Sequence, residues 1–179
     1  IGMDYARGLA MAKEWIETGS ISSKSTIRGA QKVGPLRMVG IAASSTVDQI
    51  GQSMDRTFDE AKAEIAKHGL PMDGQMISVY KKFHIKTGVF DYISGYVIPA
   101  EIELPAASRL KSWSLPACKA FHVQHVGSYK HLGNAWSIAN MHVRHKKIKQ
   151  SRVGTFEIYR TTPPVPENEL ITDIYLPLK

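Results

Sequence analysis

The chain has 179 residues, enough for one domain, or for two small half-domains that share a core, without covalent staples. Its single cysteine excludes an internal disulfide, and no stretch approaches the ~20 apolar residues of a membrane span or resembles a secretory leader. We therefore expect a cytoplasmic protein without a membrane partner, whose net charge of +7 favours anionic partners.

The first segment, "DYARGLAMAKEWIETGS", predicts one amphipathic helix that ends near Gly19. The apolar residues of this helix form one stripe, which should pack against another surface. Because the chain begins with Ile1 and not with an initiator Met, we expect it to be cut from a longer protein or to start at an artificial boundary. The Ser-rich run "SISSKSTIRG" is predicted to be a linker. Residues 1–24 would then form a helix and linker, and residues 25–179 the main domain. The stripe consists of Tyr5, Leu9, Ala12 and Ile16, with Trp15 beside them.

The next part of the chain predicts the order β-α-β-β. Residues 36–44 form a candidate strand, and a helix is expected from about Asp48 to Gly69. The β-rich runs 75–83 and 89–99 are joined by the short connection "HIKTG", so they should pair as a hairpin. The helix is indicated by apolar residues at helical spacing: Ile50, Met54, Phe58, Ala61 and Ile65.

The remainder repeats the same order. Residues 117–127 form a strand, a helix follows, and "TFEIYR" and "LITDIYLPL" are strands on either side of a proline-rich connection. Tyr80 corresponds to Tyr159, and Pro99 to Pro177. The halves, about 32–100 and 114–178, predict an α+β fold in which helices cover one side of an antiparallel sheet and a central cleft lies on a pseudo-two-fold axis. The second helix is indicated by Leu132, Trp136, Ile138, Ala139 and Val143.

One acid, Glu157, interrupts the otherwise apolar strand "GTFEIYR". A carboxylate taken out of water without a partner costs several kcal/mol or neutralises by a shift of its pKa. The equivalent position in the first half is Ser78. An acid on only one side of a symmetric cleft is more typical of a recognition group than of a solvated face.

Aromatic residues on the predicted strands and helix are candidates for the walls of this cleft. Each single ring is equally compatible with a plain core seam. A box of rings around one carboxylate is, however, a suitable receptor for a flat or cationic organic molecule. The candidate ligand-binding residues are Glu157, Trp136, Tyr80, Tyr92, Tyr96 and Tyr159.

Little in the sequence supports a nucleophilic, cofactor, metal or nucleic-acid site. Cys118 begins a strand and is more typical of a small core residue than of a nucleophile, and no G-x-S-x-G, P-loop or dinucleotide motif is present. His122 and His125 are three apart on a predicted strand and so face opposite sides, and no carboxylate or thiolate accompanies His142 and His145, so we expect no metal and no cofactor. The basic run 144–152 is either a phosphate-contacting patch or a solvated helix end. Without a nucleic-acid-binding motif, we expect no direct nucleic-acid binding.

The run "GSYKHLGNAW", followed by "TFEIYRTTPPVPENELITDIYLPL", resembles the GyrI-like small-molecule-binding family, which is also known as the effector-binding domain of bacterial transcription activators. The resemblance covers about residues 32–178. The earlier segment "IGMDYARGLAMAKEWIETG" looks like the closing helix of a START-like (SRPBCC) domain. The residues that carry the main resemblance are Gly127, Tyr129, Leu132, Trp136, Phe156, Glu157, Tyr159, Thr172, Tyr175 and Pro177.

The resemblance implies two β-α-β-β units in one antiparallel sheet, with Glu157 at the bottom of the cleft, where it meets ligand charge, and Trp136 in its wall. Some members of the family sense drugs as multidrug-binding regulators, some bind proteins, and some hydrolyse cyclopropane-containing compounds. The chain itself shows no DNA-binding segment. We expect a lipophilic, cationic small-molecule ligand, with a START-like domain or a regulatory protein as partner. The alternatives are a hydrolase with Glu157 as general acid or base, and a module whose basic "RHKKIK" face docks an acidic partner.

Overall fold

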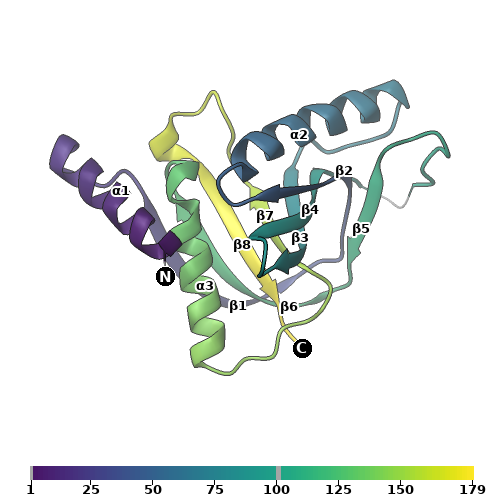
Figure 1. Ribbon diagram of the computed structural model, residues 1–179. Coiled ribbons are helices and arrows are strands. Elements are labelled where there is room, and N and C mark those ends of the chain that lie inside the picture. The colour runs from purple at the N-terminus through teal and green to yellow at the C-terminus, as the bar shows by residue number, and fades with distance from the viewer. Residues whose placement is uncertain (1, 100–101) are drawn as a thin grey trace.

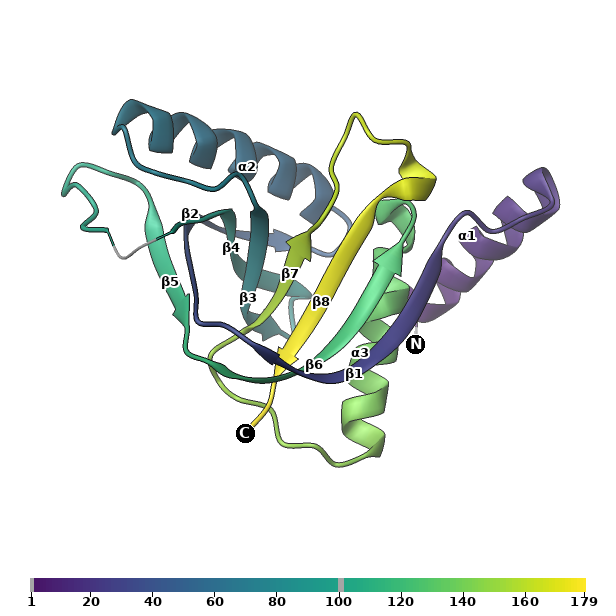
Figure 2. The same ribbon diagram turned by 180° about the vertical axis from the view of Figure 1, so that it is seen from behind.

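A computed structural model describes residues 2–99 and 102–179, so the predicted end of the first half, at residue 100, lies outside the described residues. The described strands form one antiparallel sheet in the order β1-β6-β8-β7-β3-β4-β2-β5, which curls around one side while helices cover the other (Figures 1 and 2). The elements are α1 (Gly2–Thr18), β1 (Lys24–Val33), β2 (Leu36–Thr46), α2 (Ile50–Lys67), β3 (Met76–His84), β4 (Val89–Val97), β5 (Lys111–Leu115), β6 (Cys118–Val126), η1 (Tyr129–His131), α3 (Leu132–His145), β7 (Thr155–Tyr159), η2 (Glu167–Glu169) and β8 (Ile171–Pro177).

The duplicated order is confirmed as β2-α2-β3-β4 and β6-α3-β7-β8. Helix α2 forms where the apolar residues recur at helical spacing, and it buries Met54, Phe58 and Ile65. Gly69 follows this helix with a φ of 61°, a conformation that glycine adopts without steric cost. Periodicity and a stop signal therefore suffice to define this helix.

A pseudo-two-fold axis passes through the centre of the sheet. Strands β3 and β7, one from each half, are antiparallel neighbours. When Tyr80 is aligned with Tyr159, Ser78 aligns with Glu157, and the structure pairs these last two residues directly across the strands. The axis therefore passes between Ser78 and Glu157. The register around it is Met76–Tyr159, Ile77–Ile158, Ser78–Glu157, Val79–Phe156 and Tyr80–Thr155.

Two strands were not foreseen. The predicted linker was wrong from Lys24 onward, because these residues form β1 and pair with β6. Strand β5 was not among the predicted strands, although Trp113 and Leu115 alternate with serines as strand residues do, and it pairs with β2. Strand β1 precedes the first half and pairs with β6 of the second half, whereas β5 precedes the second half and pairs with β2 of the first half. The two strands therefore extend the pseudo-symmetry. The exposed sides of edge strands tolerate polar residues, and composition alone could not reveal their distant partners.

The helices divide the sheet into three zones. Helix α2 packs on β2 and β4, and α3 packs on β6, β8 and β1. We call the space above β3 and β7, between the two helices, the central seam. The opposite face of the sheet holds a separate core, which the curl of the sheet encloses and which includes Trp113, Phe156 and Ile158. Because strand residues alternate between the two faces, Glu157 and Tyr159 lie on the helix side.

Helix α1 is confirmed as a helix, but its apolar stripe is not covered within the described part of the chain. Leu9 and Ile16 are 55% and 77% exposed. The helix contacts α3 and the turn before it through Glu14 Oε2, which lies 2.6 Å from His131 Nε2, and through Met11, whose sulfur accepts a hydrogen bond from Asn134 Nδ2 at 3.0 Å. Its assignment to a START-like domain stays a prediction. No helix within residues 2–99 and 102–179 is long and apolar enough to cross a membrane.

Asp173 anchors a buried polar network on the face opposite the helices. Its carboxylate accepts hydrogen bonds from Arg160 Nε at 2.7 Å and Gln124 Nε2 at 3.0 Å, and it lies 2.8 Å from His122 Nε2. Burial alone would raise the pKa of Asp173, but these bonds outweigh burial and lower it to about 2. The network therefore favours the ionised form and stabilises the fold above the unfolded pKa.

Asp173→Asn should lower the free energy of unfolding by about 2 kcal/mol near neutral pH, because each unit of pKa depression corresponds to ~1.4 kcal/mol. The stabilisation is present above the ordinary aspartate pKa and is lost as the pH falls towards about 2. Urea unfolding at neutral and strongly acidic pH measures both effects. A loss that stays the same at both pH values would contradict an electrostatic origin.

Candidate functional site

The centre of the candidate site is Glu157, in the middle of β7 and on the pseudo-two-fold axis. Its side chain faces the central seam and is only 1% exposed. Among the described residues it forms no ion pair with a cation. A buried carboxyl group without a cationic partner is costly unless hydrogen bonds stabilise its charge or a proton neutralises it.

Three donors from different elements surround this carboxyl group. The indole Nε1–H of Trp136, on α3, donates to Oε1. The hydroxyl of Tyr159, on β7, donates to Oε2 at 2.6 Å, and the hydroxyl of Tyr80, on β3, also hydrogen-bonds to the carboxylate. Burial raises the pKa of Glu157, and the bonds from Tyr159, Trp136 and Tyr80 offset only part of that effect. The group can therefore hold a proton at a higher pH than an exposed glutamate.

Aromatic rings pack edge to face around the carboxyl group. The ring of Tyr80 lies 5.1 Å from that of Trp136, and the ring of Tyr159 lies 5.5 Å from Phe58 and 5.7 Å from Tyr129. Tyr129 is the outermost of these rings, with 37% of its surface exposed. Burial, and then the charges of Glu157 and Asp55, raise the pKa of the Tyr129 hydroxyl to about 12. These rings provide a largely neutral, polarisable wall.

The two other predicted wall residues lie further from the carboxyl group. Tyr92 is 1% exposed and donates its hydroxyl to Ser53 Oγ on α2 at 2.6 Å. Tyr96 is 8% exposed and packs at 6.1 Å against Phe58. Both lie on the helix side of β4, beneath α2. The structure thus brings Trp136, Tyr80 and Tyr159 onto Glu157 and places Tyr92 and Tyr96 in the layer beside them.

Three neighbours of the site were absent from the predicted set: Tyr129, Met54 and Phe58. The sulfur of Met54 lies 3.6 Å from the hydroxyl of Tyr159 and 4.0 Å from that of Tyr80. Met54 and Phe58 were identified only as the apolar stripe of α2, although that stripe faces the seam. Tyr129 stands in the run "GSYKHLGNAW", which was the signal that could have included it.

Gly127 explains how Tyr129 reaches this position. The residue directly follows β6 and has a φ of 124°, a region that L side chains rarely adopt. A Cβ atom there would lie 2.5 Å from the carbonyl oxygen of Ser22. Glycine therefore allows the chain to turn closely past the segment before β1 and to enter η1, which carries Tyr129.

Solvent hardly reaches Glu157 in this structure, because the residue is almost fully buried beneath the central seam. Two cavities, of about 300 and 390 Å³, lie elsewhere on the surface, and Glu157 lines neither of them. One lies between α2 and β2, where Arg56 and Lys111 line it, and Trp113 and Lys81 line the other. Since Glu157 is buried and the rings of Trp136, Tyr159 and Tyr80 pack around it, a ligand that touches the carboxyl group would have to displace at least one of them.

The chemistry available at the seam is that of one carboxyl group among hydroxyl, indole and ring groups. It can attract a cation or carry a proton. Across the described ranges, no group of three or more His, Cys, Asp or Glu side chains is arranged to hold a metal ion. The closest titratable neighbours of Glu157 are tyrosines, and burial raises the pKa values of Tyr80 and Tyr159 well above their ordinary range. These tyrosines therefore remain neutral donors.

Similarity to known proteins points to the same kind of domain. Residues 31–179 match the family model described as the GyrI-like small molecule binding domain. A structure of SAV2435 bound to tetraphenylphosphonium has a TM-score of 0.60 at 16% identity, over 86% of this chain and 94% of that one. No curated protein matches the sequence.

Structures of EcmrR also share this fold. The C-terminal domain of EcmrR has a TM-score of 0.63 at 14% identity, over 88% of this chain and 98% of that one. EcmrR in its DNA complex has a TM-score of 0.68 at 14% identity, over 99% of this chain but only 66% of that one. At these identities the likeness is one of fold.

Proposed function

We propose that the central seam binds a lipophilic organic cation, because this chain belongs to the GyrI-like small-molecule-binding family. In this proposal the domain is the sensor of a bacterial regulatory protein. The observation that carries this proposal is the burial of Glu157 among rings without a cationic partner among the described residues. A bound cation would supply the missing charge, and ring faces attract cations most strongly when water is excluded.

The hydrogen bonds at Glu157 favour a particular class of cation. Both carboxylate oxygens already accept bonds, from Trp136 and Tyr159. A ligand therefore needs no N–H donor, and a bulky ion with delocalised charge can interact through Coulomb attraction and ring contact alone. Tetraphenylphosphonium, the ligand in the SAV2435 structure, has this chemistry and is a suitable probe.

Binding of such a probe should strengthen as the pH rises. Burial raises the pKa of Glu157, so a cation that prefers the ionised carboxylate must compete with a proton below that pKa. One linked proton changes the affinity by at most about tenfold per pH unit. Calorimetric titration of tetraphenylphosphonium at about pH 5 and about pH 8 measures this, with triphenylphosphine oxide as the uncharged control. Affinity for the cation that is independent of pH would contradict a role for Glu157 ionisation.

The raised pKa also supports a second candidate function. A carboxyl group whose pKa is raised by burial holds its proton to a higher pH than an exposed glutamate, so Glu157 could act as general acid or base in the hydrolysis of a strained, cyclopropane-type compound. Turnover separates the two functions, because a receptor returns its ligand unchanged. Mass analysis after incubation with a reactive cyclopropane compound should find only the starting material if the domain is a receptor. Hydrolysed product that disappears in Glu157→Gln would assign the enzyme.

A further inference from the structure

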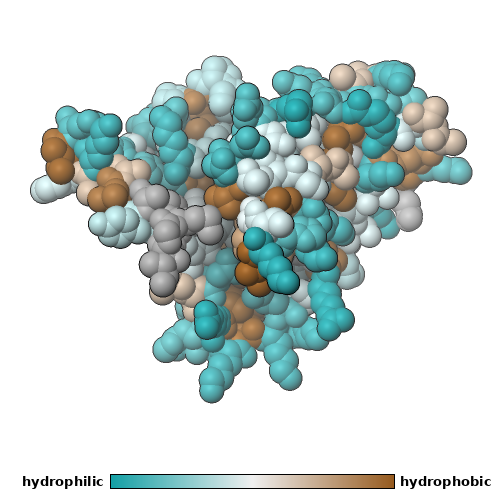
Figure 3. Space-filling model, in the orientation of Figure 1, coloured by the Kyte–Doolittle hydropathy of each residue, from teal (hydrophilic) through white to brown (hydrophobic). Residues whose placement is uncertain are grey.

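One end of the molecule collects cations from four separate parts of the chain. Strand register pairs Lys32 with Lys119, the backbone N–H of Leu178 donates to the carbonyl oxygen of Lys119 at 2.8 Å, and that of Lys179 donates to Lys149 at 2.9 Å. The connection after α3 joins them at this lower end, where hydrophilic side chains project (Figures 1 and 3). We call this surface the basic tip; it consists of Lys32, Lys119, Arg144, Lys146, Lys147, Lys149, Arg152 and Lys179.

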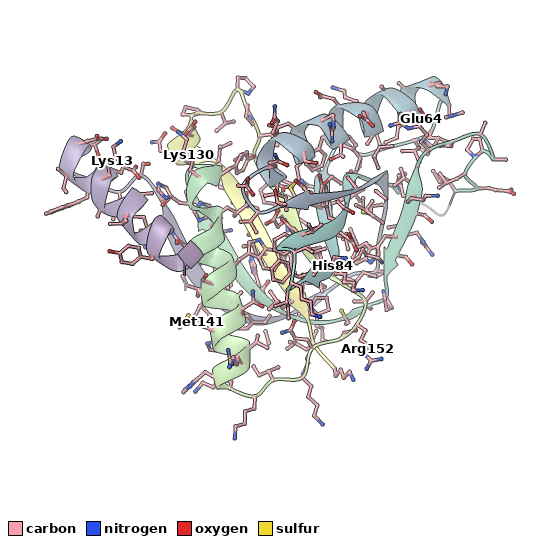
Figure 4. All side chains as sticks on the ribbon, in the orientation of Figure 1. Lys13, Glu64, His84, Lys130, Met141 and Arg152 are labelled. Atoms are coloured by element: carbon pink, nitrogen blue, oxygen red, sulfur yellow. The ribbon has the colours of Figure 1, made fainter. Side chains whose placement is uncertain are left out.

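The charge of the basic tip is not compensated. All of its cationic residues are exposed, and none forms an ion pair in the part of the chain that the structure describes. The sequence from Leu104 to Phe156 contains no aspartate or glutamate. Arg152 marks one side of the tip and α3 the other (Figure 4). Such a surface would attract an anionic partner over roughly a Debye length, ~8–10 Å.

At two positions of the basic tip the chain has a lysine although a lysine there is unfavourable for the stability of the fold. Lys32 lies directly opposite Lys119, although like charges in that position destabilise a strand pair. Lys147 has a φ of 54° and is the only described non-glycine residue with a positive φ. Glycine is the usual residue there after a helix, yet this chain has a lysine. A bound anion would relieve the repulsion at the first position.

The end of α3 does not account for the whole surface. Cations in the last turn of a helix favour its negative terminus, and this explains Arg144 and its immediate neighbours. The effect is confined to the last turn. Lys32, Lys119 and Lys179 belong to strands or to the segment after β8, so the helix gives no reason for their charge.

We propose that the basic tip docks a flexible acidic segment of a partner polypeptide. Residues 144–152, which carry five of the eight cations, contain no Phe, Tyr or Trp ring on which bases could stack, and α3 presents its C-terminus rather than an anion-binding N-terminus. A flexible acidic chain can follow cations that project from several elements at a convex end. The absence of large apolar anchors predicts binding that is fast, weak and sensitive to salt.

Fluorescence anisotropy of a labelled peptide of alternating glutamate and glycine tests this proposal. The intact chain should bind the peptide at low salt, and binding should fall steeply as salt is added. Lys119→Glu/Lys146→Glu/Lys149→Glu should weaken binding by at least about tenfold, because three attractive contacts become repulsive. The matched control Lys62→Glu/Lys82→Glu/Lys86→Glu has the same net charge and should lose less than about threefold.

Three results would overturn the proposal: no binding at low salt, equal weakening by the two triple variants, or tighter binding of a short DNA duplex than of the peptide with the same dependence on the tip lysines. Carbodiimide coupling joins peptide carboxylates to nearby lysines, so mass analysis should place the crosslinks on the tip even if a triple variant folds poorly. None of these outcomes depends on the ligand at Glu157, which lies in the central seam rather than on the tip.

Discussion

Glu157→Gln is expected to weaken the binding of tetraphenylphosphonium by at least about thirtyfold at about pH 8, because loss of one partner from a buried charge pair costs roughly 2–5 kcal/mol. Glutamine has nearly the same shape and can still accept one hydrogen bond, so the rings around it should stay in place. Binding of uncharged triphenylphosphine oxide should therefore change by less than about threefold. Calorimetric titration of both compounds against both proteins gives the comparison.

Glu169→Gln provides the matched control for this variant. Glu169 is an exposed glutamate on η2, and the same change of charge there should alter the affinity for tetraphenylphosphonium little, because solvent screens exposed charges. Equal weakening by the two variants would indicate a general effect of net charge. Equal affinity of wild type and Glu157→Gln for the cation would remove the anchor role of Glu157.

The second large effect is on stability. Burial raises the pKa of Glu157 above that of the unfolded chain, so the folded state retains the proton to higher pH. Below the unfolded pKa both states are protonated and nothing is lost. As the pH rises from there through the folded pKa, the wild type loses about 1.4 kcal/mol of stability for each unit of pKa difference. Glu157→Gln does not ionise and should escape this loss.

Urea unfolding of the two proteins at about pH 4.5, 6 and 8 tests this directly. The stability of Glu157→Gln relative to wild type should increase from about pH 4.5 upward and level off once the pH exceeds the folded pKa of Glu157, whatever the constant cost of the amide. A relative stability that is flat with pH would show that the carboxyl group ionises equally in the folded and unfolded chains. A gain in stability that accompanies a loss of binding is typical of a residue retained for function.

Much of the fold could be predicted because it depends on local patterns. Helix α2 follows from the spacing of Met54, Phe58 and Ile65, and the duplicated order of elements implied a pseudo-two-fold axis. Strand β1 could not be predicted, because it is stabilised by a partner far along the chain rather than by its own composition. Strand β5 was missed although Trp113 and Leu115 alternate with serines, because the run is only five residues long. The environment of α1 could not be predicted for a related reason. Its apolar stripe indicates that the helix packs against another surface, but the pattern does not identify that surface, and the stripe is exposed in the structure.

The candidate site was predictable in its centre and less so at its edge. Glu157 stood out because its symmetry mate is Ser78, and the structure pairs these residues across the axis. Tyr80 and Tyr159, which correspond to each other in the two halves, were candidates for the wall of the same cleft, and both lie beside Glu157. The bond from Trp136 to the carboxylate and the closing ring of Tyr129 depend on side-chain rotamers and on how α3 packs over the sheet, which no local pattern encodes.

The most direct test of cation binding in the central seam is an NMR titration of the indole N–H groups with tetraphenylphosphonium. The chain has three tryptophans, which report on different places. Trp136 donates to Glu157, Trp113 donates to the carbonyl oxygen of Val153 at 2.9 Å, and Trp15 is 60% exposed on α1. We expect the Trp136 resonance to shift with increasing ligand while the other two stay nearly unchanged. A shift of Trp113, which lines the cavity of about 390 Å³, with Trp136 unmoved would place the ligand elsewhere and contradict the account.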